Sequence, residues 1–243
     1  MDDAGSTFER LDGRAWQTVF CDRGDGDWRQ RWFMDGRRGS VQNTPEGMVF
    51  SAGPVAGDHA SHAVLWTNES FDGDLRIQFA FTRLDTIFRF VNILYIQATG
   101  TDDGVYGEDI AAWRHLREIP LMSSYYDLMR LLHVSFAAHD MDNQDPAADY
   151  IRVRRYPCIA GGFDETEVPP DVLRTGLFAP GVEHQMTFIK TRDVLAMDIR
   201  CSDVRRTFAW DLSGREAVTH GRVGIRQMWT RCSRYRDFTI QQA

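Results

Sequence analysis

The sequence has almost no lysine and no closely spaced cysteine pair. Of its 28 basic residues only Lys190 is a lysine, and the others are arginines. Biased codon usage is the simpler explanation, whereas arginine is also suited to bidentate recognition of carboxylate or phosphate groups. The four cysteines lie far apart and form no Cys-x-x-Cys pair. We therefore expect free, partly buried thiols rather than a disulfide framework.

Long apolar segments are also lacking. The longest apolar stretches, such as Val91–Ile96, are too short to span a bilayer. The acidic start, Met1-Asp2-Asp3, shows no basic region followed by an apolar one, so we expect no secretory signal and a cytoplasmic location. Because the net charge is −7, we expect no nucleic-acid partner and no association with anionic membranes.

Several cofactor and nucleophile motifs are missing as well. The sequence contains no Gly-x-Gly-x-x-Gly or Walker-type loop, no Gly-x-Ser-x-Gly elbow and no His-Glu-x-x-His motif. Asp22, Asp25 and Asp27 surround two glycines and carry oxygen ligands of the type that Ca²⁺ takes. Since a complete calcium loop is absent, we expect an ordinary Asp/Gly turn, with a structural Ca²⁺ as the alternative and no other cofactor or metal.

Apolar and polar residues alternate in many short runs, which is typical of β-strands. Asp74–Arg83 is the clearest run, with Leu75, Ile77 and Phe79 on one face, and Phe90–Ala98 is apolar on both faces. Further strands are expected at His62–Thr67, Leu131–His139, Tyr150–Tyr156, Gln185–Lys190, Val194–Arg200, Arg205–Trp210, Gly221–Trp229 and Tyr235–Gln241. About ten strands with few helices predict an all-β protein, two packed antiparallel sheets in a single domain over 1–243.

One segment, Asp102–Met129, breaks this alternation. Ile110, Trp113 and Leu116 recur at helical spacing before Pro120, and a second short helix is expected between there and Met129. A long insertion between two strands is typical of a lid or binding loop, and equally of a helical plug over an open sheet. Both interpretations remain open.

Seven segments, in order and spread over nearly the whole chain, resemble a single protein family. They are GDWRQRWFMDG (26–36), VQNTPEGMVFSAGP (41–54), HAVLWTNESFDGDLRI (62–77), VNILYIQATG (91–100), DYIRVRRYP (149–157), TGLFAPGVEHQMTFIK (175–190) and GRVGIRQMWTRCSRYRDF (221–238). The family is the YesU-like bacterial proteins, a domain of unknown function with a concanavalin-like jelly-roll fold. The family's namesake lies among genes for the use of rhamnogalacturonan, so the resemblance implies a role in processing acidic oligosaccharides.

A retaining jelly-roll glycosidase needs two carboxylates about 5 Å apart, usually alternating on one strand. No predicted strand carries such a pair, and the acidic segment 164–167 precedes Pro169-Pro170 and is expected to be a loop. A hydrolase that uses carboxylates from distant strands is therefore kept only as an alternative.

A lyase acting on uronates makes different demands on the sequence. The sugar carboxylate must be neutralised, a base must remove the C5 proton, and an acid often protonates the leaving oxygen. His133 occupies a polar position of an alternating strand and is the expected base. Tyr95 or Tyr150 is the expected proton donor. The ordinary alternative for each is a hydrogen-bonded residue of the core or rim.

Arginine and glutamine are the expected clamps for the sugar carboxylate. Arg152 and Arg154 share the polar face of their strand, and Gln97 is expected on the same face as Tyr95. Arg226 and Arg83 are further candidates for substrate binding. Ion pairs with neighbouring carboxylates are the alternative role for these arginines.

His62 and Trp66 share one strand face, and a tryptophan beside a polar group is typical of clefts that stack a pyranose ring. A core position for Trp66 is the alternative. Taken together, the residues predict a carbohydrate-active protein that cleaves an acidic oligosaccharide by β-elimination. A glycoside hydrolase and a non-catalytic, lectin-like sugar-binding protein remain open.

Overall fold

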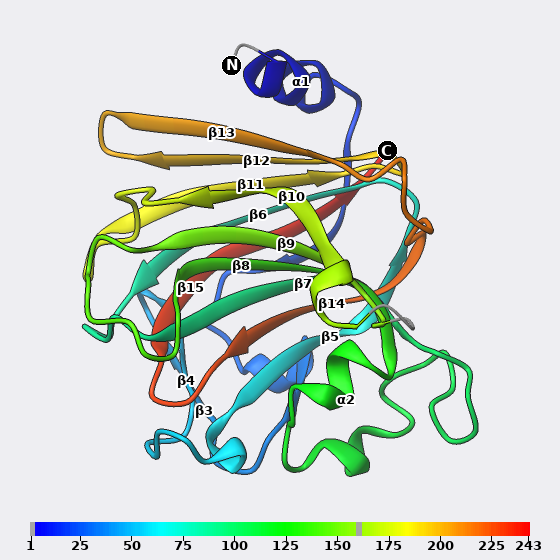
Figure 1. Cartoon of the computed structure of the whole chain (residues 1–243), viewed down its shortest axis with the longest axis vertical. Helices are drawn as coiled ribbons and strands as arrows, with labels where there is room; N and C mark the ends of the chain where they lie inside the picture. Colours follow the sequence, from blue (N-terminus) through cyan, green and yellow to red (C-terminus); the bar gives the residue numbers. More distant parts are fainter. Residues whose placement is uncertain (1–2, 159–161) are drawn as a thin grey trace.

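The computed structural model describes residues 3–158 and 162–243, and these residues form two antiparallel sheets packed face to face (Figure 1). The strands of sheet A follow one another in space as β13 (Val204–Asp211), β12 (Val194–Cys201), β11 (Glu183–Lys190), β6 (Leu75–Arg83), β15 (Cys232–Gln242), β4 (Gly47–Ser51) and β3 (Ser40–Thr44), and β1 (Gln17–Asp22) also pairs with β15. The all-β sandwich predicted from the alternation is thus confirmed.

Sheet B carries the residues on which the functional argument depends. Its strands lie in the order β10 (Glu167–Leu173), β9 (Tyr150–Tyr156), β8 (Met129–His139), β7 (Phe90–Gly100), β14 (His220–Gln227), β5 (Ala63–Asp72) and β2 (Trp32–Asp35). Sequence alternation missed β1 to β4, which have only four to six residues each, and β10, which contains Pro169 and Pro170.

The inner faces of the two sheets form the main core, because each strand presents its apolar side chains to one face of its sheet and the two apolar faces pack together. Phe79 of sheet A stacks on Phe238 with ring centroids 4.9 Å apart, and it also contacts Phe136 of sheet B at 6.3 Å. Leu94 and Val134 of sheet B are fully buried in the same cluster. The opposite face of sheet B is therefore left for other contacts.

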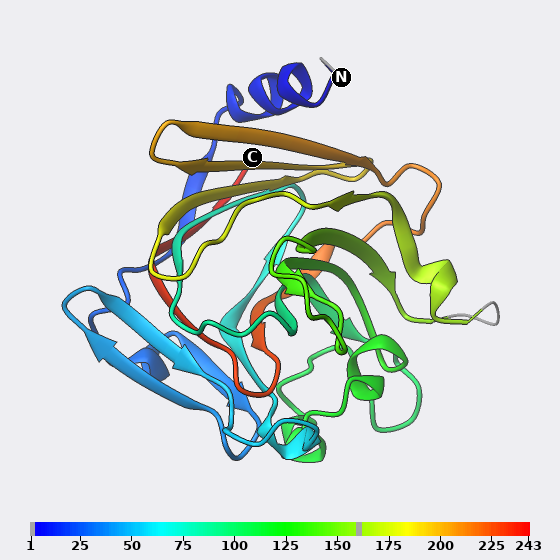
Figure 2. The same cartoon turned by 60° about the vertical axis from the view of Figure 1, so that its left-hand side comes forward.

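Helix α1 (Asp3–Asp12) lies against the outer face of sheet A, above β13 and β12 in both views (Figures 1 and 2). Phe8 and Leu11 are buried there against Ile189 and Ala196. Within the described residues no helix has the length and apolar content needed to cross a bilayer.

The segment 101–128 covers part of the outer face of sheet B (Figure 1). Its helices, η3 (Arg114–Arg117) and α2 (Ser123–Tyr126), are shorter than the sequence spacing predicts, because Pro120 interrupts the segment and β8 begins at Met129. Fully or nearly fully buried side chains, including Trp113 and Tyr125, form a second apolar cluster between this insertion and the sheet. The insertion is therefore packed on the sheet as a plug.

One buried carboxylate joins the insertion to sheet B. The Oδ2 atom of Asp35 accepts hydrogen bonds from Arg117 Nε at 2.6 Å, Trp66 Nε1 at 2.8 Å and the Tyr125 hydroxyl at 3.1 Å. The side chains of Asp35 and Arg117 are both inaccessible to solvent. Arg117 also stacks 4.2 Å from the ring of Trp113. Asp35 therefore links β2, β5 and both helical turns of the insertion.

Replacing Asp35 with asparagine should lower the free energy of unfolding by about 3–5 kcal/mol, because Arg117 would be left as a buried charge without a counterion. Urea denaturation of the wild type and Asp35→Asn measures this difference. The matched control is Asp25→Asn, which removes an exposed ion pair with Arg23 and should change stability by less than about 0.5 kcal/mol. Equal stability of Asp35→Asn and the wild type would contradict the linking role of Asp35.

Candidate functional site

A row of side chains crosses the outer face of sheet B. In the strand register Trp66 lies opposite Gly224, Gly224 opposite Tyr95, Tyr95 opposite His133, and His133 opposite Arg154. A side chain at Gly224 would collide with the ring of Trp66, so the glycine lets that ring lie flat beside Tyr95, 5.3 Å away. The histidine, tyrosine and arginine expected to act together are thus direct neighbours.

A second row lies beside the first on the same face. It runs from Arg226 through Ile93 and Ser135 to Arg152. The guanidinium carbon of Arg152 lies 4.7 Å from the ring centre of Tyr150, which places this tyrosine at the β9 end of the row. We call the two rows together the polar strip; Arg152, with a quarter of its side chain exposed, marks its open end.

His133 is held by hydrogen bonds at both ring nitrogens. Nε2 lies 2.6 Å from the Ser135 hydroxyl, and Nδ1 lies 3.0 Å from the Tyr156 hydroxyl. Burial lowers the pKa of His133 well below its ordinary value, and the charges of Arg154, Arg226 and Arg152 lower it further. The imidazole is therefore neutral, with one nitrogen protonated and the other accepting a hydrogen bond from one of these two hydroxyls.

Ser135 and Tyr156 were not selected from the sequence as site residues. The signal was present, because Tyr156 continues the alternation of Tyr150, Arg152 and Arg154 on the polar face of β9. Ser135 likewise follows His133 at a spacing of two residues. The alternation along β8 and β9 therefore indicates more residues of the strip than the ones expected to take part in the reaction.

Arg226 is a buried cation with unused hydrogen-bonding capacity. Its Nη2 atom donates to the Pro120 carbonyl at 2.7 Å, and its guanidinium lies 4.5 Å from the ring centre of Tyr125. Its Nε and Nη1 atoms have no hydrogen-bond partner in the described part of the chain. An unmatched buried donor costs free energy, and a charged one costs more. This arrangement has the chemical character of an anion site.

Tyr95 lies next to this cation. Its hydroxyl makes no hydrogen bond of ordinary geometry within the described residues. Burial raises the pKa of Tyr95 to about 12, although the nearby Arg226 opposes the shift. The phenol therefore stays protonated at neutral pH and has a free hydrogen to donate.

The two arginines of β9 are already paired with carboxylates of β10. Arg154 Nη2 donates to Glu167 Oε1 at 2.6 Å, and its Nη1 donates to Thr166 Oγ1 at 2.9 Å. Arg152 lies 2.6 Å from Asp171. The guanidinium with free donors on the strip is therefore that of Arg226, while Arg152 and Arg154 supply positive potential around His133.

Gln97 does not share the outer face with Tyr95, which corrects the expectation from alternation. Its backbone has a positive φ of 54°, and the register of β7 with β8 shifts between Ile96 and Thr99. Such a bulge reverses the side on which the next side chain emerges. The Gln97 amide instead donates to backbone carbonyls, that of Gly73 at 3.0 Å among them, and accepts from Lys190 Nζ at 2.5 Å. Gln97 and the sole lysine hold the two sheets together.

Trp66 is fully buried and cannot offer a ring face to a sugar. Its ring stacks on Tyr95 and Tyr125, and its Nε1 atom donates to Asp35. Trp66 is therefore a residue of the core, and it does not form the sugar-stacking surface considered from the sequence. Tyr125 of the insertion occupies the place where a ligand ring would lie.

His62 and Arg83 lie outside the polar strip. His62 precedes β5 and stacks on Trp229 at 4.2 Å, and burial, followed by the charges of Arg226 and His59, lowers its pKa to about 2. Arg83 is on sheet A and pairs with Asp85 at 3.1 Å. Both residues have structural partners where they lie.

The three aspartates considered for Ca²⁺ each have a separate partner. Asp22 accepts from Gly24 N at 2.8 Å and from Trp32 Nε1 at 2.6 Å. Asp25 pairs with Arg23, and Asp27 accepts from the backbone N–H of Arg29 at the start of η1 (Trp28–Gln30). Over residues 3–158 and 162–243 no group of three acidic, histidine or cysteine side chains converges as metal ligands would.

No family model and no curated protein matches the sequence. The fold is nevertheless similar to solved structures. A protein of unknown function with a galectin-like fold from Bacillus subtilis has a TM-score of 0.70 at 18% identity, covering 94% of this chain and 98% of that chain. The Lotus tetragonolobus seed lectin has a TM-score of 0.58 at 9% identity (94% and 98% covered), and the basic winged bean lectin has 0.56 at 11% (93% and 98%). The chain therefore has the concanavalin-like jelly-roll fold of galectins and legume lectins. At these identities the comparisons show the fold alone.

The buried state of His133 predicts a loss of stability in mild acid. Its pKa is lower in the folded chain than the ordinary value near 6.5, so the unfolded chain binds the extra proton and stability falls as the pH falls below about 6.5. Between pH 7.5 and 5.5 the loss due to His133 should be about 1.4 kcal/mol. Urea denaturation at pH 7.5 and pH 5.5 measures this loss. Between these two pH values the free energy of unfolding of His133→Gln should fall by about 1.4 kcal/mol less than that of the wild type. The exposed His115→Gln should behave as the wild type, and an unchanged pH response of His133→Gln would contradict this account.

Proposed function

We propose that the protein binds an acidic oligosaccharide on the polar strip of sheet B and cleaves it by β-elimination. The observation that carries this proposal is the buried guanidinium of Arg226, which lies beside the hydroxyl of Tyr95 and whose Nε and Nη1 atoms make no hydrogen bond of ordinary geometry within the described residues. A uronate carboxylate presents two acceptor oxygens to such a pair of donors. The row that contains Tyr95 also contains His133, so an acid and a base lie on neighbouring strands.

Each residue of the strip has a role in this reaction. Arg226 neutralises the uronate carboxylate, which makes the C5 proton more acidic. The neutral His133 removes that proton, and the electron pair of the C5–H bond forms the C4=C5 double bond as the C4–O bond breaks. Tyr95 donates its proton to the leaving oxygen. Ser135 and Tyr156 orient the imidazole of His133.

The charges around His133 link its basicity to the ligand. Without a ligand, Arg154, Arg226 and Arg152 all disfavour the protonated imidazole. A carboxylate bound at Arg226 offsets part of this positive potential, so it raises the pKa of His133 toward its ordinary value. The base therefore becomes stronger when the uronate is in place.

The packing of the insertion sets a condition on this proposal. Tyr125 stacks on Tyr95 at 5.7 Å and also lies over Arg226. A sugar ring can reach Arg226 only when α2 moves away from sheet B. The open end of the strip at Arg152 and Tyr150 is the side from which the chain of sugars would enter.

Two further considerations support a sugar ligand. The winged bean lectin was solved with Tn-antigen, and the VIP36 luminal domain, which has a TM-score of 0.57 at 11% identity, was solved with Man3GlcNAc, so the same fold binds carbohydrate in other proteins. Membership of the YesU-like family, which we also propose from the sequence resemblance, points to pectic and hence acidic sugars.

A non-catalytic sugar-binding protein is the second candidate function. The observation that favours it is the pair of hydrogen bonds that occupies both nitrogens of His133, because a base must have a free acceptor when substrate is bound. Hydrolysis has less support, since Glu167 and Asp171 beside the strip are each paired with an arginine.

Incubation with α-1,4-linked oligogalacturonides should produce ultraviolet absorbance from the new C4=C5 double bond. Tyr95→Phe should lower the rate about 10²–10⁴-fold because it removes the proton donor. It should lower the free energy of unfolding by less than about 1.5 kcal/mol, since the hydroxyl it removes makes no hydrogen bond of ordinary geometry within the described residues and has Arg226 as a neighbour. The control Tyr106→Phe, in the insertion but away from the strip, should keep the wild-type rate.

The outcomes of this assay separate the candidate functions. Uronate binding without any product would support the sugar-binding protein, and new reducing ends without absorbance would support a hydrolase. Full activity of Tyr95→Phe would exclude Tyr95 as the proton donor.

A further inference from the structure

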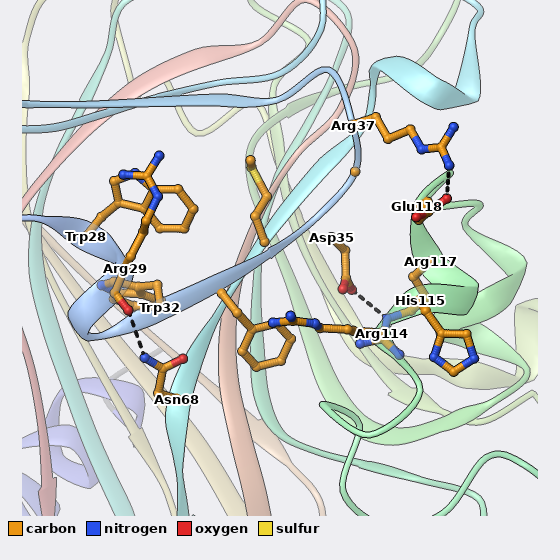
Figure 3. Close-up of a pocket in the computed structure, with 13 residues that line it drawn as sticks. Trp28, Arg29, Trp32, Asp35, Arg37, Asn68, Arg114, His115, Arg117 and Glu118 are labelled. Atoms are coloured by element: carbon orange, nitrogen blue, oxygen red, sulfur yellow. Dashed lines mark hydrogen bonds and ion pairs between the residues drawn. The ribbon is translucent and has the colours of Figure 1, made fainter.

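A cavity lies on the other flank of the insertion, at the β2 edge of sheet B. It has a volume of about 750 Å³ and opens between β2, the Asn68 region of β5 and η3 of the insertion (Figure 3). Trp28, Phe33 and Arg114 are among the residues that line it. We call it the β2 crevice. Sequence analysis selected none of these three side chains, because β2 and η3 are some 80 residues apart in the chain.

The β2 crevice is basic in a protein whose net charge is −7. Two of its four arginines have carboxylate partners within the crevice, Arg117 with Asp35 and Arg37 with Glu118. Arg114 has no ion pair with any carboxylate of the described residues, and its side chain reaches from the insertion into the middle of the crevice (Figure 3). This guanidinium is therefore available to an anion from solution.

Aromatic side chains line the opposite wall. Trp28 lies there with the guanidinium of Arg29 over its ring, 4.7 Å from the ring centre, and Phe33 lies on β2 itself. Aromatic rings beside charged and amide groups are the combination that binds a sugar ring, because its C–H face is apolar and its edge carries hydroxyls.

Two atoms of the inner wall have no hydrogen-bond partner within the described residues. They are Oδ1 of Asp35, an acceptor, and Nη1 of Arg117, a donor, and both side chains are fully buried. Polar atoms buried in this way are normally satisfied. Because neither side chain is accessible to solvent, a sugar in the crevice does not reach these two atoms, and the Asp35–Arg117 pair forms the support beneath the crevice.

We propose that the β2 crevice is a second binding site for an acidic saccharide, with the uronate carboxylate on Arg114 and the sugar ring against Trp28 and Phe33. The ligand class rests on the proposed function, but the site is separate from the polar strip, because the insertion lies between them. The crevice holds one end of a uronate chain, or a separate uronate chain, away from the position of cleavage.

Calorimetric titration with α-1,4-linked trigalacturonate tests the site. The measurement uses Tyr95→Phe chains, so that cleavage does not consume the probe. The double variant Tyr95→Phe/Arg114→Glu should have one binding site fewer per chain, or bind there at least tenfold more weakly. The reason is that the carboxylate of the sugar then meets the negative charge of the new glutamate. Adding Arg206→Ala, an exposed arginine on β13 of sheet A with no ion pair in the described residues, should change nothing.

The same titration distinguishes failure of this proposal from failure of the proposed function. If the strip does not bind uronates, Arg114→Glu still removes the one site that is observed. Unchanged stoichiometry and affinity on Arg114→Glu would overturn the β2 crevice as a uronate site, as would equal binding of the neutral galactose trimer. The ultraviolet assay would still test, independently of this result, whether the polar strip cleaves uronates.

Discussion

The buried carboxylate of Asp35 is the interaction on which the arrangement of both candidate sites depends. One oxygen accepts from a tryptophan of the sheet and from an arginine and a tyrosine of the insertion. A buried ion pair is stable only when its partners are satisfied in this way. Because Asp35 holds the insertion on sheet B, the same contact buries the polar strip on one flank and forms the inner wall of the β2 crevice on the other.

Arg226 and Arg117 show how differently two buried guanidinium groups are used. Arg117 has a carboxylate at 2.6 Å, so its charge stabilises the fold. Arg226 has a carbonyl and an aromatic ring as neighbours, and two of its nitrogen atoms have no hydrogen-bond partner in residues 3–158 and 162–243. A fold that retains an unpaired buried cation gives up stability, which is the usual cost of a binding site. This contrast is why we place the anion at Arg226 rather than at the better paired arginines.

The jelly roll supplies a rigid support but does not choose the chemistry. Its inner faces form a continuous apolar core, and the outer face of sheet B displays side chains from several neighbouring strands at fixed spacings. The same fold is found in lectins, but the fold alone does not decide what a protein binds. In the proposed reaction the chemistry depends on the few polar side chains that this outer face brings together, and it requires that α2 move away from them.

The sequence by itself determined the class of fold, ten of its strands and the alternation of faces along them. Alternation placed His133 with Arg152 and Arg154 on polar faces, and the strand register puts them side by side with Tyr95. This was possible because a period of two residues is a local property of the chain. Only the tertiary structure decided that a bulge turns Gln97 inward, that Tyr125 covers the strip and that two nitrogen atoms of Arg226 have no hydrogen-bond partner within the described residues. These depend on contacts between segments far apart in the chain, which no local pattern encodes.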